Sequence, residues 1–276
     1  MRIAVTGANG YVGSHVVAQV QREGDIVVKL VRNPAPGSGA LRFVLGESLQ
    51  ASSLTGVQRL VHCAYDFRQR TPEASSLVNV EGTRSLLGSA RAAGVEGIVV
   101  ISSMAAFPAS RSVYGRSKLA IEDVAREFDA TIVRPGLVYG DNAGHLVGAL
   151  EKQMRKRRVL PLMGGSRPMY LCHVDDLARG VSRLCRTGPP PGVVTVAWPT
   201  PVSFREFLRK LARRRMFFLP VPYQPVLWSL RLTESLGLRL GFHSDSLIGL
   251  IHNDPHPDFS HLDAIGFDPR PFVNAD

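Results

Sequence analysis

The sequence predicts an α/β protein with a doubly wound parallel sheet and a small, mostly helical C-terminal region. Two observations predict this class. In the first half of the chain, short strand-like runs alternate with stretches of helical periodicity. The strand-like runs are continuously apolar, which is typical of strands covered by helices on both faces of a parallel sheet.

The expected elements of the first half follow one another in regular alternation. Strands are expected at residues 2–6, 26–31, 59–64 and 97–102, with a further strand starting at 131–133. Helices are expected at 11–21, 77–93 and 117–128. The run 97–102, Gly-Ile-Val-Val-Ile-Ser, is the strongest strand signal in the chain.

The alternation changes after Pro135. The sequence predicts a basic amphipathic helix over 147–158, a strand over 170–174, a helix from Asp175, a loop at 188–192 and mostly helix from Ser203. We therefore expect a first domain over 1–140, whose core returns at about 170–198, and a small C-terminal region over 141–276.

Composition is that of an ordinary globular protein. Of 276 residues, 45% are hydrophobic and 20% are charged, which is enough to bury a sizeable core. The start of the chain reaches a glycine-rich turn too early for a secretory signal, and no apolar run is long enough to span a membrane. Three irregularly spaced cysteines with apolar neighbours indicate reduced thiols, so we expect a cytoplasmic protein without a metal site.

The net charge of +10 fits an anionic ligand, nucleic acid or an acidic membrane surface. The positive charge gathers at 155–158 and 209–215, where no aromatic side chains alternate with it, so we expect no nucleic-acid partner. Arginines 213–215 precede Met-Phe-Phe-Leu, with Trp228 nearby. This stretch suits either an anionic membrane interface or a lid over a substrate cleft.

The first motif, Thr-Gly-Ala-Asn-Gly-Tyr-Val-Gly at 6–13, lies directly between a strand and a helix. Gly7 permits the tight turn, Gly10 lets a pyrophosphate approach the backbone, and Gly13 lets the helix pack against the sheet. The free N–H groups of the helix start attract phosphate. In this context the motif predicts a Rossmann dinucleotide site formed by Gly7, Asn9, Gly10, Tyr11, Val12 and Gly13.

The end of the second strand bears on the choice between NAD(H) and NADP(H). An acidic residue at this position would bind the ribose 2′-hydroxyl, whereas an arginine can pair with a 2′-phosphate. The chain has Arg32 there and no carboxylate, which favours NADP(H) over NAD(H). An ordinary surface arginine at a strand end is the alternative.

The second motif, Tyr114-Gly-Arg-Ser-Lys118, places a phenol and an ammonium on one helix face. A nearby ammonium favours the phenolate, which suits acid–base chemistry near neutral pH. Ser102 and Ser103 end the preceding strand, at the sheet edge where ligands of parallel sheets bind. A serine hydroxyl at this edge could hold a substrate oxygen beside the phenol.

With these motifs the chain resembles the extended short-chain dehydrogenase/reductase superfamily, in its NAD(P)-dependent epimerase/dehydratase branch. Four further segments carry the resemblance in the family's order: His-Cys-Ala at 62–64, Asn-Val-Glu-Gly-Thr at 79–83, Arg-Pro-Gly-Leu-Val-Tyr-Gly at 134–140 and His-Val-Asp-Asp at 173–176. The C-terminal segment 254–272 resembles the branch that includes the NADPH-binding accessory subunit of respiratory complex I.

The resemblance implies roles for particular residues. Tyr114 would be the acid/base, Lys118 would tune it and bind the nicotinamide ribose, and Ser103 would orient the substrate oxygen. Tyr114 and Lys118 are also expected to contact the cofactor. The other residues expected to do so are Glu47 near the adenine, Cys63, Ala64, Asn79, Ser102, Pro135, Gly136 and Val138. By analogy the substrate is a sugar nucleotide or a similar small molecule, held by the region 141–276, and a homodimer is possible.

Three hypotheses remain open from the sequence. The chain is an oxidoreductase or epimerase acting at a secondary alcohol or ketone, or it is a non-catalytic NADPH-binding structural or regulatory protein. Membrane-surface contact is compatible with either. The short substrate region favours the second hypothesis, whereas the complete Ser-Tyr-Lys set favours the first. A dehydratase is disfavoured, because Met104 and Ala105 stand where an acidic pair is usual.

Overall fold

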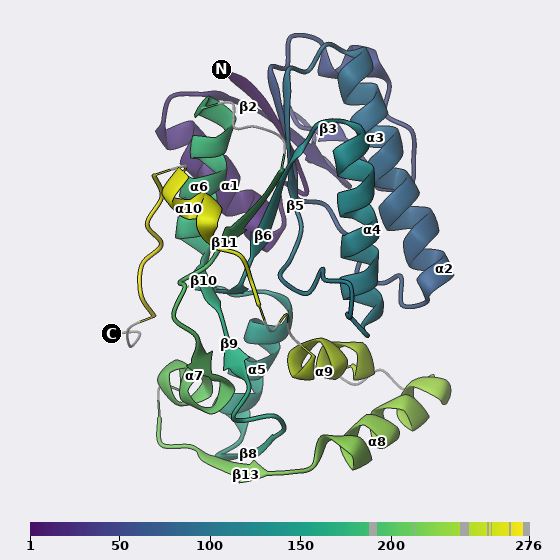
Figure 1. Cartoon of the computed structure of the whole chain (residues 1–276). Helices are drawn as coiled ribbons and strands as arrows, with labels where there is room; N and C mark the ends of the chain where they lie inside the picture. The colour runs from purple at the N-terminus through teal and green to yellow at the C-terminus, as the bar shows by residue number, and fades with distance from the viewer. Residues whose placement is uncertain are drawn as a thin grey trace.

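The computed structural model describes residues 1–187, 192–212, 214–237, 243–252, 254, 256–264 and 266–272. Its centre is a seven-stranded parallel sheet in the order β11-β6-β5-β4-β1-β2-β3 (Figure 1). The strands are β1 (Arg2–Thr6), β2 (Ile26–Val31), β3 (Leu41–Arg42), β4 (Arg59–His62), β5 (Gly97–Ile101), β6 (Thr131–Pro135) and β11 (Gly192–Val196). The order reverses at β1, as in a doubly wound fold, and the predicted fold class is confirmed.

Helices cover both faces of this sheet. On one face, α1 (Tyr11–Arg22), α6 (Val174–Thr187) and α10 (Ser260–Ala264) contribute to the core that includes Val5 and Val133. On the other, α3 (Glu81–Ala92) and α4 (Val113–Glu127) pack over Ala4, Val100 and Ile132. Burial of the strands from both sides explains why the sequence shows uninterrupted apolar runs rather than alternation.

The remaining elements form a smaller layer below the carboxyl ends of the strands (Figure 1). They include three two-stranded pairs, β7 with β10, β9 with β12 and β8 with β13. The bounds are β7 (Leu137–Tyr139), α5 (His145–Lys156), β8 (Val159–Leu162), β9 (Pro168–Met169), β10 (Leu171–His173), β12 (Val202–Ser203), α7 (Phe204–Leu211), β13 (Phe217–Pro220), α8 (Tyr223–Ser235) and α9 (Ser244–Ile251). Phe204, Phe207 and Leu208 of α7 lie at the centre of this layer's core.

The segment after α9 returns to the sheet. Leu262 of α10 enters the core beside α6, and Arg270 binds the buried Asp176 of α6 through its backbone N–H and its guanidinium, at 2.7 to 2.9 Å. The end of the described chain is therefore packed on the sheet and not only on the lower layer. None of the helices described is both long and apolar enough to cross a bilayer.

Two predicted helices begin at other residues than expected. The helix predicted at 77–93 is α3, which starts only at Glu81, after the short α2 (Pro72–Ser75) and a π-helical turn at Ser76–Val80. The helix predicted at 117–128 is α4, which starts at Val113 because the Ser112 hydroxyl accepts a hydrogen bond from the N–H of Gly115 at 3.0 Å. Tyr114 therefore lies within the helix.

The structure also differs from the prediction at two places in the second half of the chain. The region from Ser203, expected to be mostly helix, contains the strand β13, which pairs in parallel with β8. Neither strand is buried on both faces, so the apolar-run signal that identified the central strands is weak here. Of the loop predicted at 188–192, residues 188–191 lie outside the described residues, and Gly192 is the first residue of β11.

A buried carboxylate joins α4 to the sheet. Glu122 is fully buried and accepts hydrogen bonds from the Ser102 hydroxyl at 2.5 Å and from the Arg134 guanidinium at 2.6 and 2.7 Å. Arg126 adds a longer contact at 3.3 Å. The charge of Glu122 is thus compensated by partners that come after β5 and within β6, at the edge where the candidate site lies.

We expect Glu122→Ala to lower the free energy of unfolding by about 3–5 kcal/mol, because it leaves the Arg134 charge half-buried and unpaired. Glu127→Ala on the same helix is the matched control. Glu127 pairs with Arg84 at the surface, so its loss should cost under about 1 kcal/mol. Urea unfolding of both variants measures the difference, and equal losses would contradict this role of Glu122.

Candidate active site

The glycine-rich turn between β1 and α1 is shaped by close backbone contacts. Gly7 has φ +62°, and a Cβ there would stand 3.1 Å from the Ala64 nitrogen. A Cβ on Gly13 would stand 2.2 Å from the Gly7 carbonyl oxygen, so only glycine fits. Asn9 and Gly10 are exposed, and the first turn of α1 has neither a side-chain cap nor an acidic residue. This open, uncapped helix start fits the diphosphate of a dinucleotide.

Tyr11 and Val12 start the same helix. The Tyr11 ring meets His15 edge to face, with centroids 5.4 Å apart. Its hydroxyl is buried and has no hydrogen-bond partner among the residues that the structure describes. Burial, reinforced by the negative charge of Asp175, raises the pKa of Tyr11, so the phenol is protonated at neutral pH.

A chain of hydrogen bonds fixes the loop that faces the turn. The Thr6 hydroxyl oxygen accepts from the N–H groups of Cys63 and Ala64, both at 3.1 Å. It lies 2.8 Å from Nδ1 of His62, whose Nε2 lies 3.0 Å from the Thr83 hydroxyl. Thr83 in turn donates to the carbonyl of residue 79. All groups are satisfied when His62 is neutral and carries its proton on Nε2.

Burial supports this protonation state, because it lowers the pKa of His62 to about 3. Burial also raises the pKa of the Cys63 thiol to about 12, so this partly buried cysteine is no thiolate at neutral pH. Within the described part of the chain, no three His, Cys, Asp or Glu side chains come together as a metal site would require.

The residues expected near the adenine lie at the end of β2. Arg32 follows the last residue of this strand and is exposed. Glu47 forms an exposed ion pair with Arg42 at 2.6 Å. Arg42 lies in β3 in register with Val31, so it brings a second guanidinium to the same strand end. The sequence analysis missed Arg42, because β3 has only two residues and leaves no periodic signal.

Ser103, Tyr114 and Lys118 come together beyond the carboxyl end of β5. The Ser103 hydroxyl lies near enough to the Tyr114 phenol to lower its pKa, and it accepts from the N–H of Ala105 at 3.1 Å. Lys118 donates from Nζ to the carbonyl of Ile101 at 2.8 Å, and Nζ lies 6.0 Å from the centre of the Tyr114 ring. The predicted trio is therefore one cluster on α4 and the adjoining strand end.

Burial sets the protonation of this cluster. It raises the pKa of Tyr114, although the nearby Ser103 hydroxyl opposes the shift, so the phenol holds its proton at neutral pH. Burial lowers the pKa of Lys118 to about 8. A protonated phenol beside a lysine that still carries its charge near pH 7 can donate a proton to a nearby oxygen.

Two aromatic rings that the sequence analysis did not single out enclose Tyr114. Phe67 stacks on it with centroids 5.5 Å apart, and Tyr65 meets it edge to face at 5.1 Å. Nζ of Lys118 lies 4.8 Å above the Tyr65 ring. These rings give the phenol an apolar surrounding that explains its raised pKa. In the sequence, Tyr65 and Phe67 appear only as two aromatic residues shortly after β4. Such a pair does not distinguish a hydrophobic core from a functional site.

Asn79 and Ser102 use their polar atoms inside the protein. The Asn79 amide is fully buried, accepts from the N–H of Asp66 at 2.7 Å and donates to Ser75 at 3.1 Å. Ser102 donates to Glu122 as described above. Asn79 thus shapes the loop after β4, and Ser102 fastens α4. Any contact of these two with a cofactor stays a prediction.

Pro135, Gly136 and Val138 connect β6 to β7 at the same edge. A Cβ on Gly136 would stand 2.4 Å from the Tyr170 carbonyl oxygen, so this link passes close to β10. Pro135 is buried and its carbonyl accepts from the N–H of Met104 at 3.1 Å. The link therefore borders the segment that follows Ser103, where the nicotinamide end of a dinucleotide was expected.

A residue from the C-terminal part also binds the helix of Tyr114. The Asp245 carboxylate, in the first turn of α9, accepts from the N–H groups of Val113 and Tyr114 at 2.6 and 3.2 Å. Asp245 therefore caps α4 together with Ser112. Sequence reasoning missed it, because the contact joins residues 132 positions apart.

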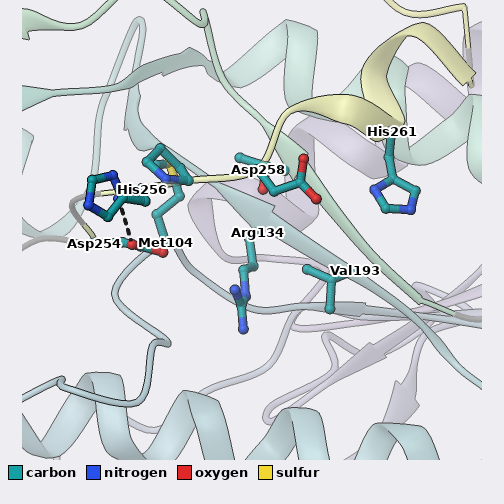
Figure 2. Close-up of a pocket in the computed structure, with 9 residues that line it drawn as sticks. Met104, Arg134, Val193, Asp254, His256, Asp258 and His261 are labelled. Atoms are coloured by element: carbon teal, nitrogen blue, oxygen red, sulfur yellow. Dashed lines mark hydrogen bonds between the residues drawn. The ribbon is translucent and has the colours of Figure 1, made fainter.

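A pocket of about 200 Å³ lies beside the cluster, between the sheet edge and the C-terminal segment. Figure 2 shows Arg134 below Asp258 with its guanidinium directed away from it, Met104 and His256 on one side and Val193 and His261 on the other. The charge of Arg134 is already bound by Glu122. The pocket marks where the returning segment meets the sheet, next to the residues that follow Ser103.

Comparison with known proteins agrees with this geometry. Residues 3–197 match the model of the NAD dependent epimerase/dehydratase family. The chain belongs to that family. The predicted family is thereby confirmed for the range that carries the glycine turn, the Tyr114–Lys118 motif and the link after β6. The likeness of residues 254–272 to a complex I subunit lies outside the matched range and stays a prediction.

Individual relatives show the range of the family. A ceramide reductase of Caulobacter vibrioides is 33% identical over 205 residues, covering 71% of this chain and 64% of the relative. A dTDP-4-dehydro-6-deoxy-D-allose reductase of a Streptomyces species is 28% identical, covering 74% and 78%. The solved structure of MoeE5 in complex with UDP-glucuronic acid and NAD matches the fold with a TM-score of 0.77 at 22% identity, covering 99% and 95%. The chain thus spans less than two thirds of the ceramide reductase.

The neutral His62 predicts a pH dependence of stability. In the unfolded chain histidine takes up a proton near pH 6.5, whereas in the folded protein it does so only near pH 3. Between these values the unfolded state binds more protons, so stability should fall as the pH is lowered, by up to about 1.4 kcal/mol per pH unit.

Urea unfolding at several pH values, compared with His62→Gln, isolates this contribution, because other histidines are unchanged in the variant. The exposed His256 provides the control His256→Gln. An equal slope for the wild type and His62→Gln would show that His62 is not the group responsible.

Proposed function

We propose that this family member binds a nicotinamide dinucleotide along the β1–α1 turn and exchanges a hydride at a secondary alcohol or ketone. The observation that carries the proposal is the Ser103–Tyr114–Lys118 cluster at the same sheet edge as the glycine turn. The hydride itself is the chemistry that the nicotinamide supplies when it is bound. The region 141–276 is proposed to hold the substrate, and a homodimer stays a prediction.

In the reduction direction, Tyr114 acts as the acid. Its raised pKa keeps the phenol protonated until a carbonyl oxygen lies within hydrogen-bond reach, where the proton passes from Tyr114 Oη to the developing alkoxide. The Ser103 hydroxyl binds the same oxygen and holds it next to the phenol. Lys118 carries positive charge close to Tyr114 and stabilises the phenolate that the transfer leaves. Reversal of these steps oxidises an alcohol.

For the cofactor we propose NADP(H) rather than NAD(H). Arg32 and Arg42 both stand at the end of β2, and the only carboxylate among the expected adenine contacts, Glu47, is paired with Arg42. Two guanidinium groups near one strand end suit a 2′-phosphate.

For the substrate, a sugar nucleotide or a similar molecule is supported by the dTDP-sugar reductase and by the MoeE5 complex. A second candidate, a long-chain amide or ketone lipid, is favoured by the 33% identity to a ceramide reductase. The rings of Phe67 and Tyr65 beside Tyr114 suit an apolar neighbour of the reacting carbon. A non-catalytic NADPH-binding protein is the alternative to both.

The deciding experiment is to identify any nucleotide that co-purifies with the protein and then to follow NADPH oxidation with keto-sugar nucleotides and with 3-ketosphingolipids. Turnover of one class assigns the substrate. Tightly retained NAD⁺ without net turnover would point to an epimerase. Nucleotide binding with no turnover of either class would favour the non-catalytic alternative, and no nucleotide binding would overturn the proposal.

We expect Tyr114→Phe to lower kcat by roughly 10²- to 10⁴-fold, because it removes the proton donor, while nucleotide affinity changes little. Tyr65→Phe is the matched control, since the Tyr65 hydroxyl bonds Ser75 and not the Ser103 cluster. Steady-state kinetics and fluorescence titration of both variants give the comparison. Wild-type turnover by Tyr114→Phe would refute the assigned role.

We expect Arg32→Ala to weaken NADPH binding roughly tenfold, about 1.4 kcal/mol, through loss of a charge-assisted bond to the 2′-phosphate. NADH binding should stay unchanged, and Arg22→Ala, at the exposed end of α1, should alter neither. Fluorescence titration with both nucleotides measures the effect. An equal loss for NADH and NADPH would show that Arg32 does not read the 2′-phosphate.

A further inference from the structure

The β8–β13 ribbon has one buried and one exposed face, and both faces are apolar. Leu160 and Leu162 of β8 are buried, and Phe218 of β13 packs on the core of the lower layer. The residues between them point outward in register: Val159 beside Phe217 and Pro161 beside Leu219. Phe217 is 65% exposed, Leu219 59% and Val159 53%. A two-stranded ribbon needs only one apolar face to pack on a core, so the outer one requires another explanation.

Helix α8 continues this exposed apolar surface. Trp228, Leu232 and Leu236 recur every four residues and are 73%, 62% and 67% exposed. Leu230, on the inner side of the helix, packs with Leu247 of α9 and holds α8 in place. Figure 1 shows β8, β13 and α8 along the lower edge, at the end of the molecule farthest from the N-terminus. We call this set of outward residues on β8, β13 and α8 the lower face.

Arginines precede both strands of the lower face, and one lies within its helix. Arg157 and Arg158 directly precede β8, and Arg215 precedes β13; all three are exposed. Arg231 lies in α8 between Trp228 and Leu232. Arg214 binds the carbonyls of residues 154, 155 and 157 at 2.6 to 3.0 Å, which holds the two arginine segments side by side.

Carboxylates do little to offset this charge. Helix α5 contains one acidic residue, Glu151, which is 22% exposed and lies 3.9 Å from Arg155. Helix α8 contains one, Glu234, whose carboxylate accepts from the N–H and hydroxyl of Ser244 at 2.8 and 2.6 Å. The lower face is therefore apolar in its middle and positive at its border.

We propose that the lower face docks on the surface of an anionic lipid bilayer. Exposed phenylalanine, tryptophan and leucine side chains gain free energy by entering the headgroup boundary, and bordering arginines bind lipid phosphates. The chain's net charge of +10 acts in the same direction. A lid packed over a substrate cleft, the other interpretation of residues 213–219, does not account for the exposure of Phe217 and Leu219. The proposal does not depend on the catalytic one.

Co-sedimentation with vesicles tests the proposal. The probe is phosphatidylcholine vesicles with and without phosphatidylglycerol. We expect the wild type to pellet with the anionic vesicles, and binding to fall in about 1 M salt, where the Debye length is about 3 Å. Phe217→Ser with Trp228→Ser, and separately Arg158→Gln with Arg215→Gln, should each weaken partitioning at least about tenfold.

One control variant and one spectroscopic readout distinguish docking through the lower face from nonspecific adsorption or misfolding. Ile26→Ser with Leu77→Ser removes side chains that are 63% and 70% exposed outside the lower face, and should bind vesicles as the wild type does. Tryptophan emission gives a second readout, because the chain has two tryptophans and only Trp228 is on the lower face. A blue shift on vesicle addition that disappears in Trp228→Phe would support docking through this face.

Three results would overturn the proposal: no pelleting of the wild type with anionic vesicles, undiminished pelleting of Phe217→Ser with Trp228→Ser, or equal losses in the Ile26→Ser with Leu77→Ser control. Light scattering after gel filtration tests the remaining alternative, in which a second copy of the chain covers the lower face. A wild-type dimer that dissociates in Phe217→Ser with Trp228→Ser, without vesicle binding, would show that a second copy covers the lower face.

Discussion

The position of the candidate site depends on how α4 is held against the carboxyl edge of the sheet. Glu122 makes this contact, and its buried charge is acceptable only because Ser102 and Arg134 reach it from two neighbouring strands. Tyr114 and Lys118 lie eight and four residues before Glu122, on the same side of the helix. One buried carboxylate therefore fixes both the rotation of the helix and its height above the strand ends.

The two serines that follow β5 both reach α4, but they have different roles. Ser102 donates to Glu122 and fastens the helix, whereas the Ser103 hydroxyl lies near the Tyr114 phenol and takes part in the cluster. The Ser102 hydroxyl is buried, and its bond to the Glu122 carboxylate offsets the cost of that burial.

The sequence predicted the sheet and the main cluster because both follow from local signals. Continuous apolar runs identified the central strands, and the glycine turn and the Tyr114–Lys118 spacing are short motifs whose geometry is decided within a few residues. The sequence could not tell that Asn79 and Ser102 bond within the protein, because a motif gives residue type and not the direction of a side chain. Nor could it find Asp245, Phe67 or Arg42, which reach the site through long-range packing or from a two-residue strand. The ribbon β8–β13 was missed for the related reason that its outer face breaks the usual apolar-in, polar-out alternation.

The cap that Asp245 places on α4 connects the C-terminal segment to the helix that carries Tyr114. The family match ends at residue 197, yet the N–H of Tyr114 is bonded by a carboxylate that lies 48 positions beyond that limit. The C-terminal segment is thus a structural component of the helix that bears the phenol as well as a neighbour of the site. A chimera that exchanges this segment between relatives would exchange the cap of α4 along with any substrate contacts, so a change in those contacts would come together with a shift in the position of Tyr114.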